Sequence, residues 1–295
     1  MSPRISCLGA AYSQSDRQEL HLSINSLLGG SRTPDQIVIV VDGPIPVDLR
    51  ILLDNWASDP LFTIVTLPVN LGLGLALREG LSRCNNEIVC RFDTDDINAY
   101  DRLAVTCEAF SSNARLDVFF SSIIEFSPKS PVLCSSRIKS VPVTDQQIKH
   151  SLLFRNVVNH PTVAFRRSSV ISSGSYEHLP YFEDYYLWLK LRKVGLVFGA
   201  TRLPLVFMRR SSTISRRFGL GYFFAEVHFL GNCLRDRLLP LWVLPIFIVR
   251  CFSRLLPFSL QRLQDYLPWR SGKFSCINPD SLPSFDRRGL GDYNF

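Results

Sequence analysis

The residues best suited to chemistry are three carboxylates, Asp93, Asp95 and Asp96, that directly follow the apolar stretch 88–92. A continuous apolar run predicts a strand buried in a parallel sheet. Ligands of open α/β sheets bind beyond the carboxyl ends of such strands. Neighbouring carboxylates repel one another unless a cation or hydrogen-bond donors neutralise them. Because hard oxygen ligands suit Mg²⁺ or Mn²⁺, the pattern predicts a divalent metal site, with an aspartate-rich turn as the simpler alternative.

A second group of residues could contact a nucleotide at the same edge of the sheet. Asp42 ends the apolar stretch 37–41, where a carboxylate could accept hydrogen bonds from a base or a ribose, or simply form an Asp-Gly turn. The segment 70–74, Asn-Leu-Gly-Leu-Gly, allows close backbone approach and leads into a helix carrying Arg78. It is not a G-x-G-x-x-G motif, and the first strand–helix turn lacks that motif too. This argues against a dehydrogenase.

A third group lies further along the chain. Glu183 and Asp184 begin an expected helix that also carries Trp188. Carboxylates at a helix N-terminus interact favourably with the helix dipole, so these two could be caps. One of them could instead be a general base if it lies in a cleft facing an acceptor. His160, before Pro161, could be a packed side chain or a site residue.

Strands and helices are expected to alternate through residues 1–126 and so to position these groups. Repeated strand–helix–strand units predict an α/β fold with a mainly parallel, doubly wound sheet. The expected strands are residues 5–11, 37–41, 62–67, 88–92 and 118–126. The expected helices begin at Ser15 with Gln18 in a capping box, span 49–56, follow the segment 70–74, and run from about 101 to 111.

The second half of the sequence is less regular. Residues 127–150 are rich in Ser, Pro, Val and Lys and are expected to be an excursion from the sheet. A short strand is expected at 163–165, and the helix from Glu183 should close at Gly195. The C-terminal third combines arginines with long apolar runs, and the chain beyond Pro268 is expected to be poorly ordered.

Composition limits the classes of protein that need considering. The 295 residues are 46% hydrophobic and 20% charged, which suffices for a core, and the net charge is +7. A basic chain suits phosphate-bearing substrates, an anionic membrane or nucleic acid, but its basic residues alternate with apolar runs and not with a stacking platform. We therefore expect no nucleic acid. The eight cysteines show no metal-binding spacing, which indicates reduced thiols.

The apolar stretch 238–249 predicts contact with a membrane surface and not a membrane span. It is shorter than the about 20 residues that a span needs, and Pro240 and Pro245 interrupt it. Arg250 and Arg254 would lie deep in the bilayer if the segment continued to residue 260. Apolar side chains in the headgroup boundary, with arginines on anionic lipid, fit better. The alternative is a buried helix packed on the sheet.

Together these motifs, in this order, resemble the signature of family 2 glycosyltransferases with the GT-A fold. The resemblance rests on Asp42-Gly43 after an apolar strand, the segment 70–74 followed by Arg78, Arg91-Phe-Asp-Thr-Asp-Asp96, and the segment 183–188. It covers roughly residues 4–270. The Asn159-His-Pro161 segment and the basic, apolar C-terminus are similar to bacterial exopolysaccharide enzymes.

The resemblance implies a role for each motif. Asp42, Asn70, Gly72, Arg78 and Asp93 would bind the donor nucleotide. Asp95, with Asp93, would bind the metal. Asp184 would be the catalytic base. Glu183, Trp188 and His160 would lie on the acceptor side. The implied domains are a GT-A domain at 1–215, with a nucleotide-sugar part at 1–126 and an acceptor part at 127–215, a membrane-associating helical extension at 216–270, and a tail at 271–295.

The implied activity is inverting, metal-dependent transfer from a UDP-sugar to a hydroxyl of a saccharide acceptor, with Mg²⁺ or Mn²⁺ as cofactor. The acceptor would be lipid-linked, and the enzyme would lie peripherally on the cytoplasmic face of a bacterial inner membrane. Two alternatives remain open. A sugar nucleotidyltransferase would need a basic, Gly-rich loop after the first strand, and this chain lacks one. A catalytically inactive membrane-associated binding protein would release no UDP.

Overall fold

The computed structural model describes residues 2–126, 137–209 and 219–255, and within them nine strands form one sheet. The strand order is β3-β2-β1-β4-β8-β6-β9-β5, with β7 paired to β6. The strands are β1 Ile5–Ala11, β2 Gln36–Asp42, β3 Phe62–Leu67, β4 Ile88–Arg91, β5 Ile97–Asn98, β6 Leu116–Phe126, β7 Arg137–Lys139, β8 Ala164–Arg166 and β9 Val197–Arg209. The predicted tail at 271–295 lies outside the described residues.

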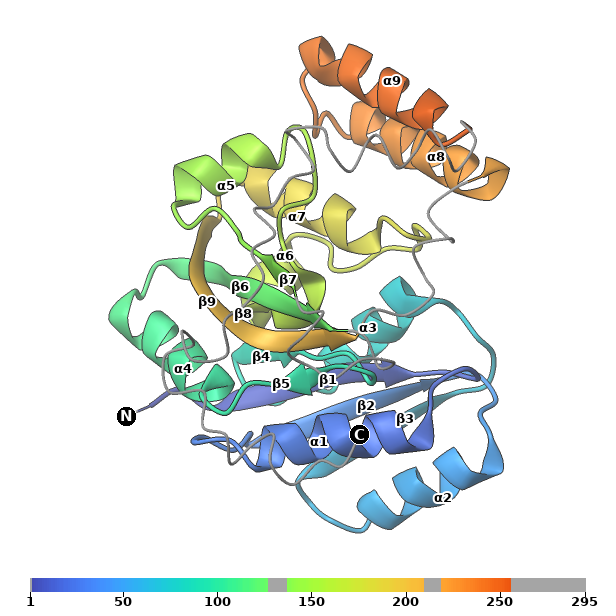
Figure 1. Cartoon of the computed structure of the whole chain (residues 1–295), viewed down its shortest axis with the longest axis vertical. Coiled ribbons are helices and arrows are strands. Elements are labelled where there is room, and N and C mark those ends of the chain that lie inside the picture. The colour runs from blue at the N-terminus through green and yellow to red at the C-terminus, as the bar shows by residue number, and fades with distance from the viewer. Residues whose placement is uncertain (1, 127–136, 210–218, 256–295) are drawn as a thin grey trace.

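The first half of the chain confirms the predicted parallel, doubly wound unit. Strands β3, β2, β1 and β4 pair in parallel, and helices connect them (Figure 1). These helices are α1 Arg17–Leu28, α2 Val47–Trp56 and α3 Leu73–Ser82, and α4 Arg102–Ser112 follows β5. The predicted cap of α1 was wrong by one residue. Asp16, not Ser15, is the N-cap, because its carboxylate accepts hydrogen bonds from the backbone of Gln18 and Glu19.

Strand β2 separates two hydrophobic cores. Its residues alternate, with Val38 and Val40 in one core and Ile37, Ile39 and Val41 in the other, as expected when successive side chains point to opposite faces. Helices α1, α2 and α4 cover the second core, and α3 and α7 lie on the first (Figure 1). Both faces of β2 are buried, which explains why its sequence is a continuous apolar run.

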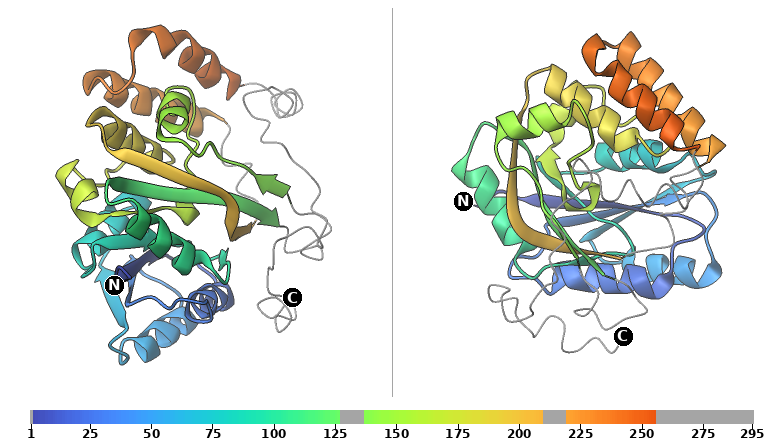
Figure 2. Two further views of the ribbon diagram at one scale, coloured as in Figure 1. Left: turned by 90° about the vertical axis from the view of Figure 1, so that its left-hand side faces the viewer. Right: turned by 45° about the horizontal axis from the view of Figure 1, so that its top comes forward.

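Strand β9 was not predicted, and it gives the sheet its curl. It runs parallel to β6 along most of its length and bends visibly (Figure 2). The register between the two strands shifts at Ser121, Ser122 and Ile123, opposite Pro204, which cannot donate a ladder hydrogen bond. At the far edge β9 pairs with β5, which follows β4 directly in the chain. The sheet therefore curls over the turn that joins β4 to β5.

Residues 127–150 were predicted to be an irregular excursion from the sheet, but the described part of this segment contains regular structure. It includes β7 and the helix α5 Asp145–Ser151, whose N-cap Thr144 accepts from the backbone of Gln147. Strand β8 runs antiparallel to both β4 and β6. The short helices η1 His160–Thr162 and α6 Arg167–Ser172 flank β8, and α7 Glu183–Lys193 follows. Helix α7 closes with Gly195 at φ 82°, as predicted.

The described part of the C-terminal extension is helical, with α8 Leu220–Arg235, η3 Leu241–Val243 and α9 Leu244–Ser253. Helices α8 and α9 pack against each other, and we call the segment from α8 to α9 the C-terminal hairpin. Glu226 of α8 is wholly buried and pairs with Arg250 and Arg254 of α9. Within the described residues, no helix has the length and apolar character to cross a membrane.

Candidate active site

The three predicted acids lie together in the turn between β4 and β5. One ligand oxygen from each of Asp93, Asp95 and Asp96 lies within 4.8 Å of the others. Asp93 and Asp95 are half-buried, whereas Asp96 is buried. The turn follows the carboxyl end of β4, the position that the sequence predicts for a ligand site.

Two arginines that the prediction did not assign to the site hold the acid turn. Arg91, the last residue of β4, is 2% exposed and forms an ion pair with Asp93. At the end of β9, the backbone N–H of Arg209 donates to Asp96 at 2.8 Å, and its side chain donates to the Asp95 carbonyl at 3.1 Å. Arg91 could have been predicted as a site residue, because it is a charged residue inside an apolar strand. Arg209 had none, because β9 itself was not predicted.

The remaining negative charge of the turn suits a divalent cation. Burial, and then the charge of Asp93, raise the pKa of Asp95 to about 6. Burial and the two neighbouring acids also raise the pKa of Asp96, whose Oδ2 has no hydrogen-bond partner among the described residues. A buried, partly unpartnered set of carboxylate oxygens fits Mg²⁺ or Mn²⁺. Asp95, with Asp93 or Asp96, could hold such an ion.

Arg102, at the start of α4, connects the acid turn to the Asn159-His-Pro161 segment. Its guanidinium is buried and donates to Asn98 Oδ1, to the Arg91 carbonyl and, at 2.8 Å, to the Pro161 carbonyl. One side chain therefore joins β4, β5 and η1 beneath the site. This role could not be predicted from the sequence, because an arginine early in a helix is ordinarily a surface residue.

At the end of β2, Asp42 organises the segment 70–74. Its two carboxylate oxygens accept from the backbone N–H groups of Leu71 at 2.7 Å and Gly72 at 3.0 Å. The side chain of Asn70 donates to the Asp42 carbonyl at 3.1 Å. Gly72 has φ 87°, a conformation that favours glycine. Arg78 is exposed on α3, where a ligand can reach it.

On the other side of the site, Asp184 lies in the first turn of α7. Its Oδ2 accepts a hydrogen bond of 2.8 Å from the side chain of Asn156, and its Oδ1 accepts from the backbone of Tyr185 at 2.6 Å. The N-cap of α7 is Phe182, which makes no side-chain cap. Asp184 is thus not the N-cap residue of α7, and Asn156, which orients its carboxylate, was not predicted.

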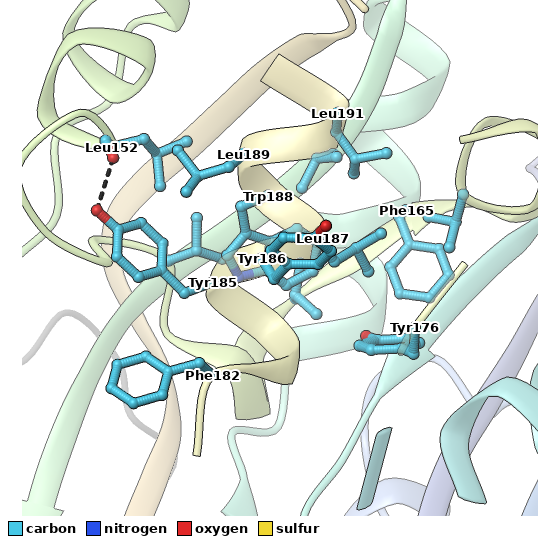
Figure 3. Packing of buried hydrophobic residues seen from close by; sticks show 14 of the residues in the cluster. Leu152, Phe165, Tyr176, Phe182, Tyr185, Tyr186, Leu187, Trp188, Leu189 and Leu191 are labelled. Atoms are coloured by element: carbon cyan, nitrogen blue, oxygen red, sulfur yellow. Dashed lines mark hydrogen bonds between the residues drawn. The ribbon is translucent and has the colours of Figure 1, made fainter. Parts of the chain in front are cut away.

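His160 and Trp188 lie in the packed layer beneath Asp184. His160 is bonded to the Tyr176 hydroxyl at 3.1 Å, and burial followed by the nearby Arg91 charge lowers its pKa well below the usual value. Its ring meets that of Trp188 edge-on at 6.0 Å. Trp188 is 0% exposed, within the aromatic layer of Figure 3, so the structure gives an acceptor no direct access to its side chain.

The segment 70–74 is in direct contact with the segment that leads into α7. A Cβ added to Gly74 would lie 2.3 Å from the Glu177 carbonyl oxygen and 3.0 Å from Glu183 Cβ. His178 is bonded to the Leu71 carbonyl at 3.1 Å. Gly74 therefore allows the start of α3 to approach the segment that leads into α7, a close approach that any side chain would prevent.

The match to known proteins agrees with this geometry. The profile of glycosyl transferase family 2 matches residues 10–174. The chain belongs to glycosyltransferase family 2. This family 2 glycosyltransferase is 32% identical over 262 residues to the amylovoran biosynthesis glycosyltransferase AmsE of Erwinia amylovora, covering 87% of the chain and 96% of that protein.

Another relative is a galactosyltransferase of Escherichia coli, named UDP-Gal:alpha-D-GlcNAc-diphosphoundecaprenol beta-1,3-galactosyltransferase. It is 31% identical over 264 residues, covering 88% of this chain and 94% of its own. Among solved structures, S. aureus TarS 1-349 in complex with UDP-GlcNAc has a TM-score of 0.64 at 14% identity, covering 88% of this chain and 77% of that one. The structural likeness confirms the predicted GT-A fold.

We predict that Glu183→Gln stabilises the protein at pH 8 but not at pH 5. Burial, and then Asp184, raise the pKa of Glu183 from the ordinary 4.5 to about 7. The folded state therefore holds a proton that the unfolded state releases between these values, so the free energy of unfolding falls as the pH rises through this window. Thermal melts of both proteins at the two pH values measure the difference.

Glu108→Gln, an exposed position on α4, is the matched control and should shift the melting temperature little at either pH. Equal shifts for Glu183→Gln at pH 5 and pH 8 would contradict the buried, protonated state.

Proposed function

We propose that the chain is an inverting, metal-dependent glycosyltransferase that moves a sugar from a UDP-sugar to a hydroxyl of a lipid-linked saccharide in bacterial polysaccharide synthesis. The observation that carries the proposal is the acid turn on the side of the sheet where α7 begins. A Cβ added to Gly74 would lie 3.0 Å from Glu183 Cβ, and the charges of Arg91 and Asp93 affect the pKa of Glu183, so the proposed donor and acceptor groups lie close together. The names of the relatives support UDP-sugar chemistry, a lipid diphosphate acceptor and polysaccharide synthesis.

The acid turn and the segment 70–74 hold the donor. Asp95 and Asp93 would hold Mg²⁺ or Mn²⁺, which would supply positive charge against the diphosphate. Asp42 fixes the segment 70–74, whose backbone would approach the nucleotide, and Arg78 contributes a cation on the exposed side of α3. Most of the acceleration comes from this positioning and from the electrostatic stabilisation of the leaving group.

Asp184 is the base of the transfer step. Its carboxylate takes the proton of the acceptor hydroxyl as the hydroxyl oxygen attacks the anomeric carbon. The bond from that carbon to the UDP oxygen breaks, and UDP leaves with the electron pair. Attack from the face opposite UDP inverts the anomeric configuration. Glu183 lies beside Asp184 and can hydrogen-bond to the acceptor, with His160 supporting the layer below.

The two alternatives, a sugar nucleotidyltransferase and an inactive binding protein, can be distinguished from a glycosyltransferase. Membership of the glycosyltransferase family decides against a sugar nucleotidyltransferase. An inactive binding protein would bind UDP without turning over its sugar, so the rate of UDP release distinguishes it from an enzyme.

The exposed apolar side chains of the C-terminal hairpin support a peripheral place on a membrane surface. Helix α9 buries Phe247 and Cys251 against the protein, yet its other faces are also apolar, and Val249 is 70% exposed. A helix that is apolar on its exposed face as well as on its buried face needs a second apolar environment. Further exposed apolar residues of the hairpin are Leu220, Phe224, Val227, Leu241, Trp242, Ile246, Ile248 and Phe252. The exposed Arg235 can meet anionic headgroups.

The metal role predicts that Asp95→Ala weakens UDP binding in the presence of Mn²⁺, because the diphosphate charge is then less well compensated. Calorimetric titration with UDP, with and without Mn²⁺, measures the effect. Asp48→Ala, an exposed change on α2, serves as the control. If Asp95→Ala binds UDP as tightly as the parent does with Mn²⁺ present, Asp95 does not hold the metal.

If Asp184 is the base, Asp184→Asn should slow turnover by about 10²–10⁴-fold, because the amide cannot accept the proton, while UDP binding is retained. Measuring UDP release from each of a panel of UDP-sugars in the presence of Mn²⁺ identifies the donor and gives the rate. NMR of the product reports the anomeric configuration. Parent-like turnover by a folded Asp184→Asn variant would remove Asp184 from the mechanism, and a retained configuration would contradict inversion.

The membrane role predicts that the full chain sediments with phosphatidylglycerol vesicles at low salt, and less so at high salt. Replacing the exposed pair Ile248 and Val249 by Glu should abolish sedimentation, because the charges oppose insertion of α9. The same double change at the exposed Val47 and Ile51 of α2 is the control. A full chain that ignores anionic vesicles at low salt would disprove the membrane role.

A further inference from the structure

The C-terminal hairpin touches the catalytic part of the protein at the residues that surround Asp184. Phe229 of α8 is 0% exposed, and the rings of Phe182 and Tyr185 stack on it at 4.8 and 5.1 Å. These two residues stand on either side of Glu183 and Asp184 in the sequence. The first turn of α7 therefore rests on α8.

A second contact runs through the loop that carries Asn156. Arg250 of α9 donates to the carbonyl of Phe154 at 3.1 Å, and the Phe154 ring packs on Trp242 at 5.7 Å. Two residues later, Asn156 donates to Asp184 at 2.8 Å. The same loop is held from the other side, because the Tyr185 hydroxyl donates to the Leu152 carbonyl at 2.7 Å (Figure 3).

The position of Arg250 is itself fixed by the buried charge of Glu226. Glu226 is 0% exposed and pairs with Arg250 on one side and Arg254 on the other. Arg250 also lies over the Phe247 ring at 4.2 Å. Breaking a buried ion pair leaves an uncompensated charge, so this network holds the two helices in one arrangement.

We propose that the C-terminal hairpin positions the catalytic base: Phe229 supports the first turn of α7, and Arg250 holds the loop from which Asn156 orients the Asp184 carboxylate. The proposal rests on the role of Asp184 in the proposed function. It goes beyond membrane attachment, because it makes the hairpin necessary for turnover even where no membrane is present. Asn156, Phe229 and Arg250 are positioning residues, and none of them needs to touch the substrate.

The pH dependence of turnover tests whether Asn156 acts on Asp184, because a residue with a purely structural role would leave that dependence unchanged. Asn156→Asp keeps the size of the side chain but places a second carboxylate beside Asp184. Like charges at this distance raise one pKa of the pair. Other charged and titratable groups also act on this site. Glu183 and the Tyr176 hydroxyl interact electrostatically with Asp184, and Arg91 and Asp93 interact with Glu183. These groups are the same in every variant, so they do not account for a difference between variants.

The experiment measures UDP release from UDP-galactose and UDP-N-acetylglucosamine with Mn²⁺, in the absence of detergent and lipid, with water as the acceptor. We expect Asn156→Asp to shift the acid limb of the kcat profile to higher pH by about one unit or more. Asn156→Ala and Phe229→Leu should lower kcat by about 10–10²-fold while the Kd of UDP stays within about twofold of the parent. Hydrogen exchange of the peptides covering 152–158 and 181–186 should rise in Phe229→Leu.

His228→Ala, an exposed neighbour of Phe229 on α8, is the matched control and should match the parent in every measurement. An unchanged pH profile for Asn156→Asp would overturn the role of Asn156. Parent-like kcat and hydrogen exchange in Phe229→Leu would overturn the role of the hairpin. A different result is expected if the proposed function itself is wrong. In that case Asp184→Asn turns over as fast as the parent, or the parent releases no UDP.

Discussion

Three carboxylates share one turn, and much of the structure serves to hold them there. Asp93, Asp95 and Asp96 place their oxygens within 4.8 Å of one another at the end of a buried strand. Their mutual repulsion would open the turn if it were not opposed. Arg91 opposes it from β4, and the backbone and side chain of Arg209 oppose it from β9. Arg91 directly precedes the turn in the chain, and the curl of the sheet brings Arg209 to the same turn.

The same turn explains why so much charge is buried in this region. Arg91 and Arg102 are each 2% exposed, and Arg102 crosses from the acid turn to the Pro161 carbonyl. A buried guanidinium is costly unless acceptors surround it, and here Arg102 donates to Asn98 and to the carbonyls of Arg91 and Pro161, while Arg91 pairs with Asp93. These contacts join β4, β5 and η1 beneath the acid turn. Preorganised charge of this kind stabilises a transition state without rearrangement during the reaction.

The C-terminal hairpin has two faces with different tasks. One face shares a core with α7 through Phe229, and the other exposes side chains such as Val249 to the surroundings. In the proposed function the exposed face meets the membrane that carries a lipid-linked acceptor. In the further inference the buried face holds the base. Taken together, the two proposals would hold the base at a fixed position relative to the membrane surface that carries the acceptor.

The sequence by itself determined the parallel half of the fold and the acid turn. Buried strands read as apolar runs, and the residues that follow them must meet at one edge of the sheet, so Asp42, Asp93 and Asp95 could be named as candidates, whereas Asp184 was named through the family resemblance. It did not determine β9, because the register shifts opposite Ser121–Ile123 and the pairing with β5 depend on strands far apart in the chain. Nor did it reveal Asn156 or Arg209, since each acts through a contact made only in three dimensions. Periodicity reports which face of an element is buried, whereas tertiary structure alone decides which polar groups meet there.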